Sequence, residues 1–131
     1  MNPFLLTFLY FIVAIAVVVV GLIVFEQITR KYKDWDEIRG NNTAVALSIG
    51  GKIIGICIII TFSIFHNDTI TETIIWGLFG MVLQLAAYIL FELMTRSFSV
   101  EEQLKSGNLA VGIVSFSVSV GLAFVIGASI S

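Results

Sequence analysis

Long uninterrupted runs of hydrophobic residues dominate the chain, and short polar segments separate them. Four such runs cover residues 4–25, 43–65, 71–91 and 109–131. A helix rises about 1.5 Å per residue, so roughly 20 residues cross the hydrocarbon core of a bilayer. Lipid offers backbone polar groups no partners, and an apolar run of this length satisfies them only as a helix. We therefore predict an all-α membrane protein with four transmembrane helices.

Composition supports this assignment and excludes several classes of protein. The chain is 58% hydrophobic and 12% charged, whereas soluble domains carry about 25% charged residues. A net charge of −2 without a basic tail gives no reason to expect a nucleic-acid partner. The first hydrophobic run has no positive residue before it and is longer than a signal-peptide core, so we predict a retained span. The expected surroundings are a lipid bilayer.

Lysine and arginine fall on one side of the predicted membrane. They occupy the segments between spans one and two and between spans three and four: Arg30, Lys31, Lys33, Arg39, Arg96 and Lys105. Short cytoplasmic loops carry the excess of Lys and Arg in membrane proteins. Both of these segments are therefore predicted to be cytoplasmic, with the His66 turn and both termini outside.

Three short motifs occur twice with the same spacing. Phe25-Glu26-x-x-Thr29-Arg30 recurs as Phe91-Glu92-x-x-Thr95-Arg96, Asn42-x-Ala44-Val45 recurs as Asn108-x-Ala110-Val111, and Gly55 matches Gly121. Every pair is 66 residues apart (for example 91 − 25), so the two copies align without a gap. We predict two tandem two-helix units, residues 1–65 and 66–131. Because each unit contains two spans, the units are parallel repeats rather than inverted ones.

Residues shared by the two copies have mainly structural interpretations. Glu26 with Arg30, and Glu92 with Arg96, are spaced for ion pairs where spans one and three leave the membrane. Binding of a cytosolic partner or an ion is the alternative role for these four residues.

Each cytoplasmic segment is predicted to hold a short amphipathic helix. Asn42 and Asn108 stand directly before spans two and four, where they would act as N-caps. In the second segment, Ser99-x-x-Glu102 resembles a capping box that opens a helix, and Gly107 could end it. The first segment has a similar layout, shifted by one residue, in Asp34-x-x-Glu37 and Gly40. The apolar residues that we expect at the membrane surface are Trp35, Ile38, Val100 and Leu104.

In both copies a glutamate and an arginine stand where the first span ends, and Asn-x-Ala-Val stands where the second span begins. With this doubled pattern the chain resembles the YshE-type small bacterial membrane proteins. This family is known as domain of unknown function 350 and uncharacterised protein family 0719. The resemblance covers essentially the whole chain, including its length and its four spans. It implies a bacterial cytoplasmic-membrane protein with no established activity. It also associates some relatives with systems of membrane stress or membrane remodelling.

Two polar residues interrupt the spans at similar depth. Lys52 follows Asn42 by ten residues, which is about 15 Å on a helix, and its counterpart in the second copy is Val118. Gln84 precedes Glu92 by eight residues, about 12 Å from the same side. We predict that Lys52 and Gln84 face one another or a shared wet cavity, with Tyr88 nearby. The alternative is that Lys52 extends its stem to the cytoplasmic surface.

Small residues at a spacing of four predict close helix packing. Gly51 with Gly55, and Ser117 with Gly121, follow this rule, as does Ser115 with Ser119. Packing inside the bundle or between copies of the chain explains them, and a hydroxyl-lined pore is the alternative.

Function is predicted only by class. We expect no enzyme and no cofactor, because the sequence has no nucleophile–base pair or paired carboxylates at depth. We expect no metal site either; the His66 turn, with Asp68 and Glu72, is interpreted as an ordinary polar turn. The preferred hypothesis is a small homo-oligomeric channel for ions or small solutes. The alternative is a membrane scaffold that recruits a cytosolic protein of membrane stress or remodelling.

Overall fold

Four long helices and two short ones make up the part of the chain that the structure describes. The computed structural model describes residues 2–28, 34–94 and 99–130. Its helices are α1 (Pro3–Ile28), α2 (Asp34–Arg39), α3 (Thr43–His66), α4 (Ile70–Met94), α5 (Val100–Lys105) and α6 (Leu109–Ile130). The four long helices are the predicted spans, with ends that differ from prediction by at most three residues where they are described. All four are long and apolar enough to cross a membrane.

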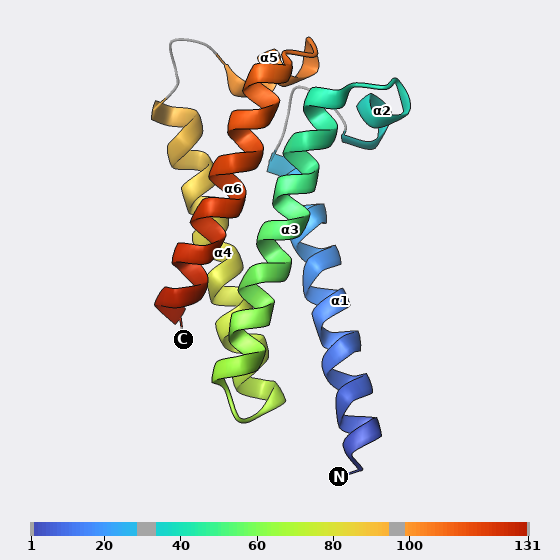
Figure 1. Cartoon of the computed structure of the whole chain (residues 1–131), viewed down its shortest axis with the longest axis vertical. Helices are drawn as coiled ribbons and strands as arrows, with labels where there is room; N and C mark the ends of the chain where they lie inside the picture. The colour runs from blue at the N-terminus through green and yellow to red at the C-terminus, as the bar shows by residue number, and fades with distance from the viewer. Residues whose placement is uncertain (1, 29–33, 95–98, 131) are drawn as a thin grey trace.

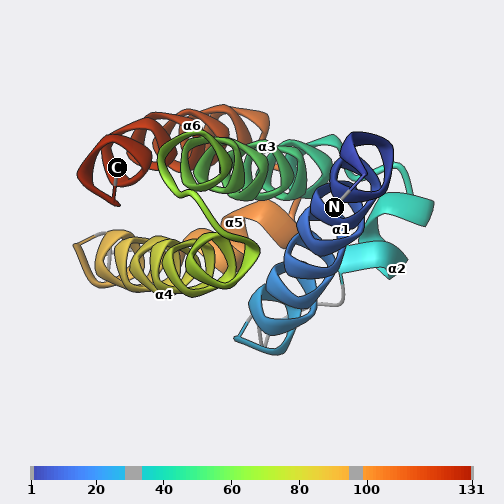
Figure 2. The ribbon, with the colours of Figure 1, turned by 90° about the horizontal axis from the view of Figure 1, so that it is seen from below.

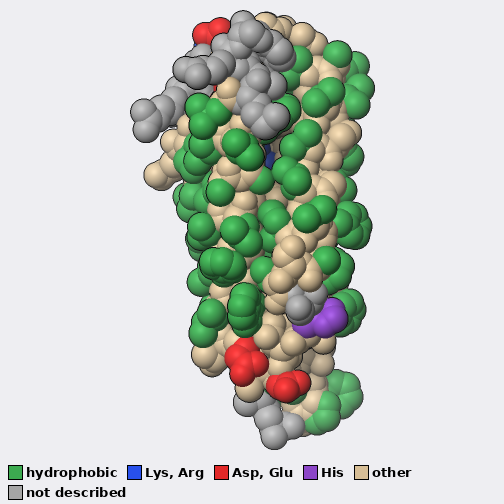
Figure 3. Space-filling model, turned by 90° about the vertical axis from the view of Figure 1, so that its left-hand side faces the viewer, with side chains coloured by type: hydrophobic (Ala, Val, Ile, Leu, Met, Phe, Trp, Pro, Cys, Tyr) green, Lys and Arg blue, Asp and Glu red, His purple; other side chains and the backbone are tan. Residues whose placement is uncertain are grey.

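The outer surface is suited to lipid. Large hydrophobic side chains stand exposed along every long helix, among them Phe8 (58%), Phe79 (50%) and Val125 (60%). Figure 3 shows hydrophobic side chains covering the middle of one face, with acidic side chains toward its two ends. Because such a surface is unfavourable in water and favourable in hydrocarbon, the chain is an integral membrane protein.

The ends of the helices gather on two sides. The N-terminus, the C-terminus and the turn between α3 and α4 lie toward one end of the bundle, and α2 and α5 lie at the other (Figure 1). This is the arrangement expected of four spans joined in sequence.

The helices α3 and α6 form the centre of the bundle. They run parallel to one another and make the most extensive contact between any two elements. Glycines allow this approach: a Cβ added at Gly51 would lie 2.9 Å from Phe116 Cα, and one added at Gly112 would lie 2.8 Å from Ala44 Cα. Close backbone approach of this kind drives helix association in lipid, where burial from water contributes nothing.

The other two long helices pack on this central pair unequally. In the view along the bundle, α4 lies beside both α3 and α6, whereas α1 crosses at the edge of α3 (Figure 2). Gly80 of α4 lies close to both partners, since a Cβ there would meet Ile59 of α3 and Ile130 of α6. The helix α1 packs through Val17 and Phe25 against Ile56 and Ile60.

Asparagines cap the two central helices, as predicted. The side-chain oxygen of Asn42 accepts from Val45 N (3.2 Å), and that of Asn108 accepts from Val111 N (3.3 Å). Ser99 likewise caps α5 by accepting from Glu102 N, and Gly107 has a φ of +84° just after that helix.

Gly40 directly follows the last residue of α2, and the residue with positive φ is the next one, Asn41 (φ 63°). One prediction about the short helices is wrong. Val100 and Leu104 do not lie at the membrane surface. Both are fully buried in a cluster with Ala44, Val45 and Ile49, so they attach α5 to α3.

Candidate functional site

Lys52 lies inside the bundle. It is the tenth residue of α3, about 15 Å from the start of that helix, and its exposed fraction is 0%. Side chains of a helix tilt toward its N-terminus, so the stem runs toward the end of the bundle that carries α2 and α5. It ends among aromatic rings, and no part of it reaches the surface of the chain. The predicted alternative, extension to the cytoplasmic surface, does not describe this structure.

Two rings from different helices surround the ammonium group. Lys52 Nζ lies 4.6 Å from the ring centroid of Tyr88 on α4 and 5.2 Å from that of Phe25 on α1. The rings meet edge to face, with centroids 5.8 Å apart and planes at 77°. A desolvated cation–π contact is worth about 2 kcal/mol. A lysine at a helix centre costs about 2.5–3.5 kcal/mol to insert, so the two rings offset most of this cost.

Gln84 is the second buried polar side chain of the site. It is 3% exposed, and its Nε2 donates to Ser119 O of α6 at 2.8 Å. Its Oε1 has no hydrogen-bond partner among the residues that the structure describes. The amide fits because Gly55 of α3 has no side chain: a Cβ there would lie 2.7 Å from Gln84 Nε2 and 3.2 Å from Ser119 O.

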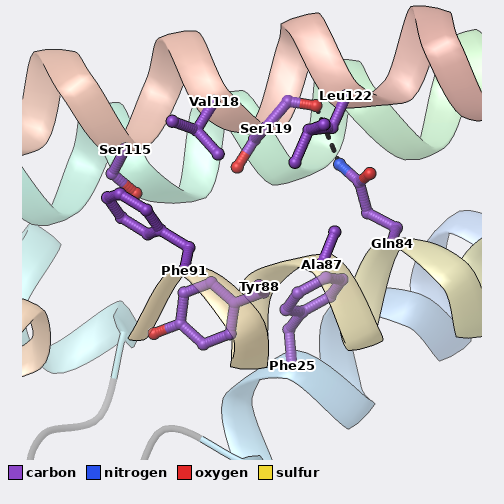
Figure 4. A pocket seen from close by; sticks show the side chains of 9 residues that line it. All are labelled: Phe25, Gln84, Ala87, Tyr88, Phe91, Ser115, Val118, Ser119 and Leu122. Atoms are coloured by element: carbon purple, nitrogen blue, oxygen red, sulfur yellow. Dashed lines mark hydrogen bonds between the residues drawn. The ribbon is translucent and has the colours of Figure 1, made fainter. Parts of the chain in front are cut away.

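A small cavity lies beside Gln84 and the two rings that contact Lys52. It is lined by the two aromatic rings that contact Lys52 and by polar and apolar residues of α4 and α6: Phe25, Gln84, Ala87, Tyr88, Phe91, Ser115, Val118, Ser119 and Leu122 (Figure 4). The volume open to the centre of a water molecule is about 10 Å³, enough for about one water. The hydroxyl of Ser119 points into the space, and Ser115 Oγ lies 3.2 Å from Ser48 Oγ.

The structure thus places the three residues predicted to lie together, Lys52, Gln84 and Tyr88, close to one another inside the bundle. Gln84 and Tyr88 line the same cavity, and Lys52 lies against the ring of Tyr88. Sequence reasoning missed the position of Phe25 beside Lys52. The signal that could have found it is the repeated motif, which begins at Phe25 and again at Phe91, because both of these residues line the cavity. The sequence predicts Ser115 and Ser119 to be small packing residues, with a hydroxyl-lined pore as the alternative, and the structure places both at the cavity.

The residues predicted at the ends of spans one and three are described only in part. Glu26 and Glu92 lie near the ends of α1 and α4, and Glu92 Oε1 accepts from Ser99 Oγ at 3.4 Å. Arg30 and Arg96, the partners predicted for them, lie outside the described residues. The ion pairs therefore stay predictions.

The predicted packing residues have two different surroundings. Gly51 and Gly55 contact α6 closely, as described above. Ser117 is exposed and returns its hydroxyl to Ile113 O, and a Cβ added at Gly121 would meet nothing within 4 Å. Around the axis of α6, Ser117 lies about 200° from Ser115, and Gly121 lies about 200° from Ser119. Both residues are therefore on the outer face of this helix. Packing of this face between copies of the chain stays a prediction.

Comparison with known proteins agrees with the resemblance in the motifs. The chain is 42% identical over 121 residues to the UPF0719 transmembrane protein YshE of Bacillus subtilis (strain 168), covering 92% of this chain and 90% of that protein. It is 29% identical over 103 residues to the UPF0719 inner membrane protein YjfL of Escherichia coli (strain K12), covering 79% and 76%. No solved structure gives a significant match. The family model described as Domain of Unknown Function (DUF350) matches residues 1–130, and the chain belongs to this family of transmembrane proteins.

Proposed function

We propose that this chain is the subunit of a small homo-oligomeric channel for ions or small solutes in the bacterial cytoplasmic membrane. The observation that carries the proposal is the polar centre: Lys52, fully buried at mid-span, beside a cavity lined by Gln84, Ser115 and Ser119. Polar and charged groups inside a membrane are expensive, and they mark ion and substrate pathways in membrane proteins. A channel has a use for such a centre, whereas a scaffold has none.

The arrangement described is a closed one in this proposal. The cavity admits about one water molecule, which is too little for a continuous path through the membrane. Separation of α4 from α6 would widen it, because the contact of Gln84 Nε2 with Ser119 O joins these two helices across the cavity. Opening is therefore expected to break this hydrogen bond.

The proposal includes the predicted repeat, which a set of paired hydrogen bonds supports. Asn41 N donates to Ile38 O, and 66 residues later Gly107 N donates to Leu104 O. The bonds of the next residues repeat in the same way: Asn42 N to Glu37 O, and Asn108 N to Gln103 O. Two tandem units, 1–65 and 66–131, account for this regularity.

Packing between copies of the chain is proposed on the outer face of α6. Residues of α6 pack closely against Gly51 and Gly55 of α3, whereas their repeat counterparts, Ser117 and Gly121, are exposed on the outer face of α6. In lipid, small residues on an open helix face favour close contact with another helix. A second copy of the chain would supply it and would complete a path that four helices alone are too few to enclose.

Orientation follows from charge in this proposal. The segments that carry α2 and α5 hold six of the seven Lys and Arg residues, so they face the cytoplasm and both termini lie outside. The cytoplasmic membrane is the location suggested by the relative named an inner membrane protein. We propose no catalytic activity, cofactor or metal.

The direct test is flux through liposomes that contain the purified protein. We expect release of trapped ions or small solutes, with the rate changed at least threefold by Lys52→Met and by Gln84→Leu. Ile54→Met is the matched control, since Ile54 lies on the same helix as Lys52 and is 42% exposed on the outer surface.

Absence of flux at any voltage, pH or membrane tension, from protein shown to be folded, would contradict the channel. Recruitment of a cytosolic protein that depends on Arg30 and Arg96 but not on Lys52 would instead identify the scaffold.

A further inference from the structure

The contact between α3 and α6 buries one stripe of α3 completely. The stripe consists of residues that contact α6, and all five are buried: Ala44, Ser48, Gly51, Gly55 and Ile59. Their spacing of three or four residues places them on one side of the helix. In the predicted repeat, the residues 66 positions later form the outer stripe of α6: Ala110, Val114, Ser117, Gly121 and Val125. All five of these are exposed, so the same stripe is buried in one unit and open in the other.

The α6 side of this contact has an open counterpart as well. The row of α6 residues that lies against α3 is Gly112, Phe116, Ser119, Ala123 and Gly127. The residues 66 positions earlier form the outer stripe of α3: Ala46, Gly50, Ile53, Cys57 and Thr61. Three of them are exposed and two are half-buried. A Cβ added at Gly50 would meet none of the described residues within 4 Å.

The two outer stripes point away from one another within a chain. Around the axis of α3, Cys57 lies about 200° from Gly55, which faces α6. Gly121 lies about 200° from Ser119, which faces α3. The stripes are therefore on opposite sides of the α3–α6 pair and cannot meet in one copy. In a second copy with the same orientation in the membrane, α3 runs parallel to α6 of the first, as these helices do within the chain (Figure 1).

Both outer stripes are suited to close contact between helices. Small side chains occur on them at a spacing of four, in the pairs Ala46 with Gly50, Cys57 with Thr61 and Ser117 with Gly121. In lipid this spacing favours helix association.

The fit differs slightly from that of the contact within the chain. Ser117 and Ala46 have a Cβ where their counterparts, Gly51 and Gly112, have none, so the two helices would lie slightly farther apart. Gly50, which takes the place of Phe116 opposite this serine, leaves room for its hydroxyl.

We infer that copies of this chain associate head to tail, with the outer stripe of α6 in one copy packed on the outer stripe of α3 in the next. Each stripe then makes the contact that its counterpart, 66 residues away, already makes within the chain. The inference rests on the proposed homo-oligomer and adds the partner surface to it. Because the contact joins two different surfaces, every copy can make it twice, and the copies close into a ring if the rotation between neighbours permits.

The test is disulfide cross-linking in the membranes that contain the expressed protein. The contact of Gly55 with Ala123 corresponds to a contact of Gly121 in one copy with Cys57 in the next. A Cβ added at Gly55 lies 3.4 Å from Ala123 Cβ, and disulfides join Cβ atoms about 3.5–4.5 Å apart. We expect Gly121→Cys to bond to the natural Cys57 of a neighbour when copper phenanthroline oxidises the two thiols. Dimers, trimers and higher species should form, because each copy carries both thiols on opposite sides.

Phe79→Cys is the matched control on the outer surface of α4, where Phe79 is 50% exposed. Cys57, Phe79 and Gly121 each lie nine residues from the end of their helix at the same side of the bundle (66 − 57, 79 − 70 and 130 − 121). We expect at least fivefold more cross-linked protein from Gly121→Cys than from Phe79→Cys, and none when Cys57→Ser is added to Gly121→Cys.

A second pair of positions keeps the test decisive if Gly121→Cys does not fold. The contact of Ala44 with Gly112 corresponds to one of Ala110 with Ala46 of the next copy. Ala46→Cys combined with Ala110→Cys and Cys57→Ser should therefore give the same ladder of species.

The outcomes separate this inference from the proposed function. Cross-linking of Gly121→Cys that survives Cys57→Ser and stops at the dimer would overturn the inference, because two α6 helices would then face each other. Cross-linking no greater than that of Phe79→Cys in both pairs would overturn it too. Flux through wild-type liposomes is measured separately. Flux without these cross-links leaves the channel standing and rejects the head-to-tail contact, whereas cross-links without flux support the contact and contradict the channel.

Discussion

Gly55 and Gly121 occupy the same position in the two predicted repeats, yet their surroundings differ completely. Gly55 faces the amide of Gln84 and the backbone of α6, and Gly121 faces outward with nothing within 4 Å of an added Cβ. The identity of the residue is therefore required by packing in one copy only. At Gly55 the missing side chain is what lets Gln84 reach Ser119 O.

This difference predicts unequal effects of the same substitution. Gly55→Ala places a methyl 2.7 Å from Gln84 Nε2 and 3.2 Å from Ser119 O, so one of these groups must move. Overpacking of this kind costs about 1–3 kcal/mol. Gly121→Ala is the matched control, and because alanine favours helices more than glycine does, it should be neutral or slightly stabilising.

The measurement for this pair is unfolding in mixed micelles by increasing sodium dodecyl sulfate, followed by far-ultraviolet circular dichroism. Equal stability of the two alanine variants would contradict the packing described around Gly55.

At the scale of elements, the two asparagine caps join different parts of the chain. Asn108 Nδ2 donates to Gln103 Oε1, within its own predicted unit. Asn42 Nδ2 makes the corresponding, longer contact to Glu37 Oε1 (3.5 Å) and in addition donates to Leu104 O (2.9 Å) and Lys105 O (3.0 Å), at the last turn of α5. Asn42 therefore caps α3 and also binds two carbonyl groups in the last turn of α5, which links the first predicted unit to the second.

Replacement by aspartate separates these two roles. Asn42→Asp keeps an oxygen for Val45 N but loses the donor to α5 and sets a carboxylate against two carbonyl oxygens. We expect a loss of about 1–3 kcal/mol from two backbone hydrogen bonds. Asn108→Asp keeps the corresponding cap, and Gln103 adapts by turning its amide to donate, so the loss there should be below about 1 kcal/mol. The same detergent titration measures the free energy of unfolding of both variants. A larger loss of stability for Asn108→Asp than for Asn42→Asp would show that the link to α5 is unimportant.

At the scale of the whole molecule, the sequence predicts the elements well and their arrangement poorly. Hydropathy gives the four spans because lipid forces apolar runs into helices, and Asn42, Asn108 and Ser99 mark helix starts because capping is local. The burial of Val100 and Leu104 was not predictable in the same way. Their spacing fits a helix lying on lipid and a helix lying on protein equally well, and only the position of α3 decides between them.

The candidate site shows the same division. Depth along a helix can be counted from its ends, so Lys52 and Gln84 were correctly set at similar levels. Which helices surround them depends on packing, and α1 contributes Phe25 although the repeat gives no reason for it to lie beside Lys52. In the second copy the counterpart of Lys52 is Val118, which lines the cavity without a charge.

The central claim is that Lys52 lies within the protein, away from both lipid and bulk water. The most direct measurement is the nuclear magnetic resonance signal of its ε-carbon, from protein with ¹³C-labelled lysine in nanodiscs, assigned by its loss in Lys52→Arg. Relaxation is compared after adding a paramagnetic lipid and, separately, a water-soluble gadolinium chelate. Exposed reference groups are Lys105 for water and the methyl groups of Ile113 (51% exposed), labelled in a second sample, for lipid.

We predict that neither agent relaxes the Lys52 signal as strongly as it relaxes the corresponding reference, because the exposed fraction of Lys52 is 0%. Relaxation by the paramagnetic lipid equal to that of Ile113 would mean that Lys52 faces the bilayer. Relaxation by the chelate equal to that of Lys105 would mean that it reaches the aqueous surface. Either result would contradict the polar centre on which the proposed function depends.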